Sequence, residues 1–177
     1  MTTMISLQAS HLESLGEATA FIARMREIID PMPLFENLDT AEIADLARYL
    51  ICFRAPPGKE IIREGEAGDF MLLVLDGAIE VTKQDGGLPQ RVATVGPGKT
   101  VGEMSLIDGE PRFASCVALT ALEFAVLDRQ GLARLIHEQP RLGVKLMMEL
   151  LMLLNQRLRS VGAQLMECIA TRRLRIR

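Results

Sequence analysis

The sequence predicts an α+β protein in which an antiparallel, jelly-roll-like β-roll is flanked by N-terminal helices and by a long C-terminal helix. The period of the apolar residues changes twice: helical spacing gives way to short apolar runs after "APPG" (55–58), and it returns from Gln130 onward. Turn-forming residues separate the short runs, as in a β-sandwich or barrel. With 177 residues, 49% of them hydrophobic, the chain suits one domain with helical extensions.

Two helices are predicted ahead of the β-roll. Apolar residues recur at helical spacing from Leu7 to Ile29, and Pro31 ends the pattern, which predicts an N-terminal amphipathic helix. A shorter helix is predicted over "LDTAEIADLARYL", with Asp39 or Thr40 as its N-cap. We therefore divide the chain into an N-terminal helical extension (1–32), a β-roll domain (33–136), and C-terminal helices with a basic tail (137–177).

Five apolar runs provide the predicted strands: "KEIIREG", "FMLLVLDG", "AIEVTKQDGG", "QRVATVGPG" and "SCVALTALEFAVLD". Asp85, Gly86 and Gly87 have the chemistry of a hairpin turn, since glycine accepts the positive φ that tight turns require. The C-terminal helical pattern runs to about Met166, and Pro140 divides it into two helices.

Composition and isolated residues limit the function. The formal net charge of −3 provides no general attraction to nucleic acid or to an anionic membrane. The three cysteines, Cys52, Cys116 and Cys168, are an odd number at wide spacing, which favours free thiols in a reducing compartment.

Without a signal-peptide pattern or a run of about 18 apolar residues, we expect a cytoplasmic protein with no membrane span. His11 and His137 stand alone, so we expect neither a metal site nor an enzyme.

One stretch, "VGEMSLIDGEPRFAS", places the opposite charges of Glu103 and Arg112 among small and apolar residues. Gly102 and Gly109 bracket about one helical turn, whose free backbone N–H groups would bind an anion. A guanidinium can bind phosphate through two hydrogen bonds, and a carboxylate can accept a hydrogen bond from a sugar hydroxyl. These residues together predict a nucleotide site. The alternative is a structural ion pair between Glu103 and Arg112.

The segment "GEMSLIDGEPRFAS" resembles the phosphate-binding cassette of cyclic nucleotide-binding domains, a family that includes catabolite activators, cAMP-dependent kinase regulatory subunits and bacterial cyclic-nucleotide-gated channels. Three flanking segments resemble the same family: "PLFENLDTAEIADLARYL", "GKEIIREGEAGDFMLLVLDGAIEV" and "LEFAVLDRQGLARLI". The resemblance covers roughly Pro33 to Arg159. It implies that the ligand is cAMP, with cGMP or another cyclic nucleotide as alternatives.

The resemblance also implies roles for individual residues. Arg112 would hold the exocyclic phosphate, Glu103 would bind the ribose 2′-hydroxyl, and Arg157, on the long helix that closes over the base, would contact the base. Further hydrogen bonds would come from the backbone of Gly102, Ser105 and Ala114. The walls around the base would be Val81, Val92 and Val101.

Phe113 departs from the family pattern, which usually places alanine, serine or threonine directly after the cassette arginine. Phenylalanine has no hydroxyl to contact the phosphate or a guanine. Its ring either points outward or fills part of the pocket, and the second arrangement would weaken or abolish binding.

The C-terminal helices suggest how a signal would leave the domain. Only 15 residues follow Gly162, so we expect no helix-turn-helix, kinase or channel domain there, and a sensor that acts through a partner of unknown identity. The long helix is apolar on more than one face, which predicts a homodimer through paired helices. Two other functions stay open: a ligand-free dimerisation or scaffold module, and a nucleic-acid accessory that binds through the arginines of "TRRLRIR".

Overall fold

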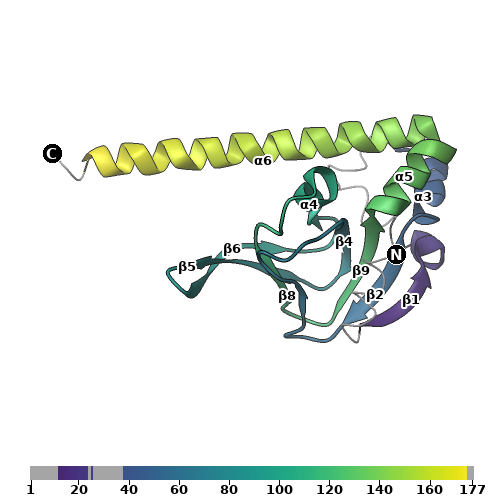
Figure 1. The fold of residues 1–177 in the computed structure, drawn as a ribbon, viewed down its shortest axis with the longest axis horizontal. Coiled ribbons are helices and arrows are strands. Elements are labelled where there is room, and N and C mark those ends of the chain that lie inside the picture. Colours follow the sequence, from purple (N-terminus) through teal and green to yellow (C-terminus); the bar gives the residue numbers. More distant parts are fainter. Residues whose placement is uncertain (1–11, 24, 26–37, 175–177) are drawn as a thin grey trace.

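The computed structural model describes residues 12–23, 25 and 38–174, and it shows two antiparallel sheets with helices at one end and along one side (Figure 1). Within these residues the first sheet has five strands in the order β1-β2-β9-β4-β7. They are β1 (Glu13–Glu17), β2 (Ile51–Ala55), β9 (Leu122–Asp128), β4 (Phe70–Asp76) and β7 (Thr100–Val101). The second sheet, ordered β3-β8-β5-β6, contains β3 (Glu60–Ile62), β8 (Ser115–Ala118), β5 (Ile79–Asp85) and β6 (Leu88–Val95). The predicted fold class is confirmed.

Strands β4 and β9 are apolar without alternation because both of their faces are buried. Successive side chains of a strand point to opposite faces of the sheet. One face of these two strands therefore packs inside the roll through Phe70, Leu72, Val74, Leu122, Phe124 and Val126. The other face packs against helices through Met71, Leu73, Leu75, Ala125 and Leu127. The five-stranded sheet thus separates two apolar cores.

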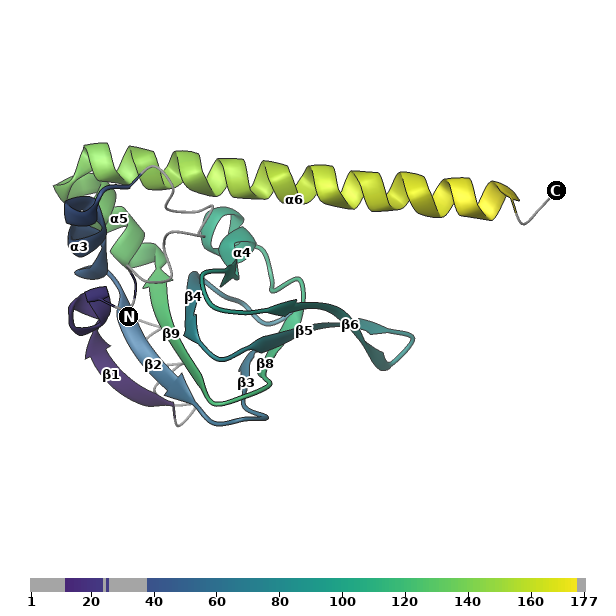
Figure 2. The same cartoon turned by 180° about the vertical axis from the view of Figure 1, so that it is seen from behind.

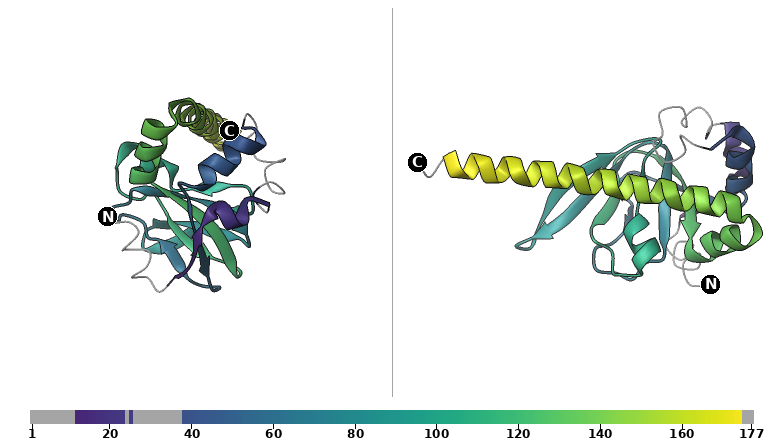
Figure 3. Two further views of the ribbon diagram at one scale, coloured as in Figure 1. Left: turned by 90° about the vertical axis from the view of Figure 1, so that its right-hand side faces the viewer. Right: turned by 90° about the horizontal axis from the view of Figure 1, so that it is seen from above.

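The outer face of this sheet packs against α3 (Thr40–Ala47), α5 (Arg129–Glu138) and α6 (Pro140–Leu174). Helix α6 packs on the sheet through Leu142, Leu146 and Leu150, then passes over α4 (Glu103–Asp108) and continues beyond the roll (Figures 1 and 3). All side chains described from Asn155 to Thr171 are exposed. The far half of α6 therefore has little packing within its own chain.

Several local predictions are confirmed. Asp39 caps α3, accepting hydrogen bonds from the backbone N–H groups of Ala41 and Glu42, and the Glu42 carboxylate accepts one from the Asp39 N–H. Residue 140 divides α5 from α6, as predicted from its proline. Gly86 and Gly87, with φ of 58° and 86°, form the turn of the β5–β6 hairpin.

The predicted N-terminal helix is wrong at Glu13–Glu17, which form strand β1 on the edge of the five-stranded sheet. Strand β1 pairs with β2, and the register shifts between Ser14 and Gly16, where Gly16 has a φ of 87°. This pairing satisfies the edge of β2, which outweighs a local helical pattern. A 3-10 helix, η1 (Ala18–Phe21), follows. Ile22, Ala23 and Met25 are helical, as predicted, and residues 7–11, 24 and 26–29 of the predicted helix lie outside the described residues.

Within the described parts of the chain, no helix has both the length and the apolar character needed to cross a bilayer. The predicted role of the basic tail depends on the side chains of Arg172, Arg173, Arg175 and Arg177, which lie outside the described residues, and so does His11.

Candidate functional site

The predicted cassette connects β7 to β8, and its one-turn helix α4 lies below α6 (Figure 2). Gly102 and Gly109 cap α4 with φ of 87° and 76°, a left-handed conformation that favours glycine. A Cβ at Gly102 would also come within 2.8 Å of Arg112 Nη1 and 2.9 Å of the Phe70 carbonyl oxygen. Gly102 therefore allows both the turn and the close approach of Arg112.

Arg112 is buried, with 5% of its surface exposed. Its Nη1 donates to the carbonyl oxygens of Phe70 (2.8 Å) and Gly102 (3.1 Å), and its guanidinium carbon lies 4.2 Å from the centroid of the Phe70 ring. Its Nη2 is buried and has no hydrogen-bond partner among the residues that the structure describes. A buried donor without a partner costs about 1–3 kcal/mol, so an anion that accepts from Nη2 would be stabilised here.

The surroundings of Arg112 include residues that the sequence pattern did not single out. Burial lowers the pKa of its guanidinium, and Cys116, Asp69 and Glu103 act in the opposite direction. A Cβ at Gly68 would lie 2.0 Å from Arg112 Nε, so a side chain there would displace the guanidinium. For Gly68 and Asp69, the sequence signal was the segment "EAGDF", in which they stand just before β4.

Glu103 is buried, with 1% of its surface exposed, and hydrogen bonds reach both of its carboxylate oxygens. The Thr100 hydroxyl donates to Oε1, and Arg157 Nη1 donates to Oε2 at 3.1 Å. Arg157 Nη2 also donates to the Thr100 carbonyl oxygen at 2.8 Å. The ion pair of Glu103 is therefore with Arg157 of α6, and the structure does not favour the alternative pairing with Arg112.

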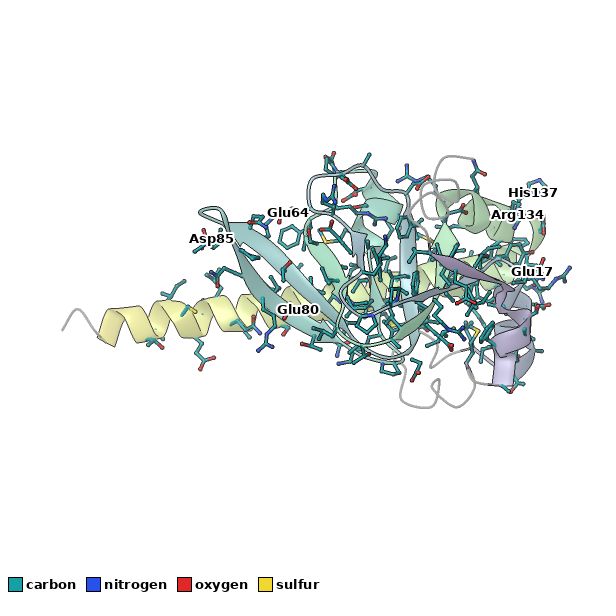
Figure 4. The ribbon with its side chains drawn as sticks, turned by 90° about the horizontal axis from the view of Figure 1, so that it is seen from below. Glu17, Glu64, Glu80, Asp85, Arg134 and His137 are labelled. Atoms are coloured by element: carbon teal, nitrogen blue, oxygen red, sulfur yellow. The ribbon has the colours of Figure 1, made fainter. Side chains whose placement is uncertain are left out.

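Phe113 points away from the cassette, with 56% of its surface exposed. Lys83 Nζ lies 4.3 Å from the centroid of its ring and donates to its carbonyl oxygen at 2.7 Å. The same Nζ donates to Glu64 Oε1, and Lys83 and the Gln84 backbone N–H lower the pKa of the Glu64 carboxyl. Figure 4 shows Glu64 near the hairpin that carries Asp85. Of the two predicted arrangements, the structure has the outward one.

We therefore expect Phe113→Ser to change the affinity for a cyclic nucleotide by less than about threefold, because an exposed ring contributes little to a buried site. Isothermal titration calorimetry on protein freed of carried-over nucleotide would measure this affinity. A gain of tenfold or more in the serine variant would mean that the ring enters the pocket.

The residues predicted to wall the base differ in exposure. Val101 is buried and Val81 is half-buried, whereas Val92 is 57% exposed. Between Val81 and Thr82 the register of β5 and β6 shifts, which places Ala93 rather than Val92 opposite Val81. The glycines of the hairpin turn predicted that β5 and β6 pair, but a bulge of one residue leaves no clear signal in the sequence.

Ser105 and Ala114 are both buried. The Ser105 carbonyl oxygen accepts from Arg129 Nη2 at 2.9 Å, and the Leu106 carbonyl oxygen accepts from Arg129 Nε and Nη2. A guanidinium at these positions satisfies carbonyls at the C-terminal end of α4 and interacts favourably with the helix dipole. Because Arg129 begins α5, it links the cassette to the C-terminal helices.

The cysteines and histidines lie outside this arrangement. Cys52 and Cys116 are buried, which raises the pKa of each thiol to about 12, and Cys168 is exposed on α6. His137 is exposed on α5, at the end of the molecule opposite the hairpin tip at Asp85 (Figure 4). In the described residues, no group of three or more His, Cys, Asp or Glu side chains could hold a metal ion.

The β-roll thus places a buried glutamate on a glycine-capped turn and a buried arginine three residues after that turn. The sequence profile described as cyclic nucleotide-binding domain matches residues 53–139. A crystal structure of a cyclic nucleotide-binding domain from Methylobacillus flagellatus is 38% identical, covers 88% of each chain and superposes with a TM-score of 0.79. The chain belongs to the cyclic nucleotide-binding domain family.

Two curated relatives are regulatory proteins. The chain is 28% identical over 148 residues to the CRP-like cAMP-activated global transcriptional regulator of Mycobacterium tuberculosis, a match that covers 83% of this chain and 64% of the regulator. It is 39% identical over 105 residues to the cAMP-dependent protein kinase regulatory subunit of Yarrowia lipolytica, which covers 59% of this chain and 28% of the subunit. The chain thus matches less than two thirds of the length of either relative.

Proposed function

We propose that this chain is a cyclic nucleotide sensor whose ligand is cAMP, and that it is a binding module rather than an enzyme. One observation carries the proposal: Arg112 is buried beside a glycine-capped turn with a guanidinium nitrogen that lacks a partner in the described structure. The exocyclic phosphate would accept from this nitrogen. Names of two relatives, the cAMP-activated regulator and the cAMP-dependent kinase subunit, support cAMP as the nucleotide.

Glu103 supports the sugar end of the same site. A carboxylate has about four lone-pair positions, so an acceptor position remains beside the bonds from Thr100 and Arg157. The ribose 2′-hydroxyl would donate to this position. Val81 and Val101 would contact the base, and Arg157, held over the cassette by Glu103, would lie on the α6 side of the ligand.

We expect cAMP at about 100 times its Kd to raise the Tm by roughly 5–10 °C, because binding to the native state adds about 2.7 kcal/mol and a chain of this size gains about 2–4 °C per kcal/mol. Thermal shift assays with cAMP, cGMP and 5′-AMP would measure this. 5′-AMP, which lacks the cyclic phosphate, is the matched control. Because Phe113 has no hydroxyl and points away from the cassette, residue 113 offers guanine no contact, and cGMP should bind no more tightly than cAMP.

A second candidate function is a ligand-free dimerisation module. It is favoured because most hydrogen-bonding groups of the site already have partners within the chain. Both carboxylate oxygens of Glu103 and Nη1 of Arg112 are hydrogen-bonded without a ligand. A Tm unchanged by cAMP and by cGMP, in protein that still dimerises, would support this candidate and contradict the sensor.

For the output of the sensor we propose a homodimer through α6. Apolar residues of α6 from Leu151 onward follow a heptad pattern, with Leu151, Leu158 and Leu165 at one position and Leu154, Val161 and Cys168 three residues later. The side chains of Leu151, Leu158, Val161 and Leu165 are 56–70% exposed in the single chain. A second copy of the helix would bury them with two-fold symmetry. A structural change caused by ligand binding at Glu103 would then be transmitted to the second copy through Arg157 and α6.

A further inference from the structure

Thr100 contacts both groups that meet at the sugar end of the proposed site. Its side chain is buried, with 2% exposure, and strand β7 fixes its backbone opposite Leu73 of β4. Its hydroxyl donates to Glu103 Oε1, and its carbonyl oxygen accepts from Arg157 Nη2. Thr100 thereby links the buried carboxylate, the central strand and helix α6.

The chemistry of these contacts assigns Thr100 a task. A hydroxyl has one hydrogen to donate, and here it goes to Oε1, which fixes the rotation of the carboxylate. Oε2 then faces Arg157, whose Nη2 is engaged by the Thr100 carbonyl and not by the carboxylate. Without the hydroxyl, the Glu103 carboxylate would be free to rotate and to present both oxygens to the guanidinium, the bidentate geometry that arginine prefers. That pairing would compete with a sugar hydroxyl for Glu103.

We propose that Thr100 is a positioning residue for recognition of the ribose 2′-hydroxyl: it holds Glu103 so that the carboxylate can accept from the sugar while still paired with Arg157. This inference rests on the proposed function and deepens it. The residue acts through Glu103, so its loss should weaken the contribution of one ligand hydroxyl and leave the phosphate contact to Arg112 intact.

The test compares cAMP with its 2′-deoxy analogue in isothermal titration calorimetry. Wild-type protein should prefer cAMP by on the order of tenfold to a hundredfold, the usual effect of a hydrogen bond to a charged group. Thr100→Val, which keeps the shape of the side chain, should reduce that preference to less than about threefold without changing the affinity for the deoxy analogue. Thr100→Ser should restore it. Thr94→Val, at an exposed threonine of β6, is the matched control and should keep the full preference.

Thermal unfolding without ligand provides a second readout. Thr100→Val should lower the Tm of the wild type by about 2–4 °C, and should lower the Tm of a Glu103→Leu variant much less, because that variant has already lost the hydrogen bond. Equal decreases of the Tm in the wild type and in the Glu103→Leu variant would contradict the proposal that Thr100 positions Glu103.

The outcomes separate this inference from the proposed function. If Thr100→Val retains the wild-type preference for cAMP over its 2′-deoxy analogue, or binds both ligands more weakly by the same factor, the inference is overturned and the proposed sensor function stands. Wild-type protein that binds neither nucleotide would overturn both.

Discussion

We expect Arg112→Gln to bind cAMP about 30-fold to several thousand-fold more weakly than the wild type, the equivalent of about 2–5 kcal/mol for a desolvated charge pair. Calorimetric titration would measure the loss. The ligand phosphate would face a site without its cation, and the neutral amide cannot make two parallel hydrogen bonds to it. Glutamine can still donate to a backbone carbonyl, as Arg112 Nη1 does to Phe70.

The fold should survive this change, because a buried charge is itself costly and burial already lowers the pKa of the Arg112 guanidinium. Circular dichroism and the Tm of the ligand-free variant would confirm that it is folded. Arg54→Gln is the matched control, since Arg54 of β2 is about half exposed and pairs with Glu13 of β1 and Glu123 of β9. A folded Arg112→Gln protein with wild-type affinity would contradict the assignment of the phosphate to Arg112.

The double variant Leu158→Glu/Leu165→Glu should be monomeric at concentrations where the wild type is a dimer. Two carboxylates at the centre of a helix pair would have to be buried against their own copies, which costs several kcal/mol. Light scattering and sedimentation would measure the mass. Gln156→Glu, exposed on the same helix but outside the heptad positions, should remain a dimer.

The position of the charge decides whether this test reports on association. Leu150 is fully buried against the sheet of its own chain, so a charge there would test folding instead. Cys168 adds an independent readout: diamide oxidation should cross-link a parallel pair, and Cys168→Ser should abolish the cross-link. Wild-type protein that is monomeric at every concentration would contradict the dimer.

Much of the fold could be predicted because local chemistry determined it. The runs in β4 and β9 are buried on both faces, so their apolar character is continuous, and the hairpin glycines at 86 and 87 allow one turn geometry. Strand β1 could not be predicted in this way. "ESLGE" carries little strand signal, and its conformation is decided by pairing with β2 about 40 residues later.

The same distinction applies to the site. The spacing within the cassette predicted a short helical turn bracketed by Gly102 and Gly109 that begins with Glu103, and the structure confirms this turn, with Arg112 three residues beyond it. The partner of Glu103 could not be read from that spacing, because Arg157 is 54 residues away on a helix whose register depends on packing. Gly68 was also missed, since its importance lies in a side chain from another loop that passes over it.

The unbroken course of α6 has a mechanical consequence. Arg157 fastens the helix near its midpoint, and the 17 residues from there to Leu174 extend about 26 Å further at 1.5 Å per residue. If α6 tilted as a rigid body, it would pivot where Leu142, Leu146 and Leu150 pack against the sheet. A tilt of about 5° at this pivot would move the far tip by several ångströms, because the tip lies about 36 Å beyond Leu150. A shift of less than about 1 Å of Arg157 relative to Glu103 would thus be amplified into a displacement of several ångströms at the C-terminal end of α6, which is large enough to change a contact with a neighbouring protein.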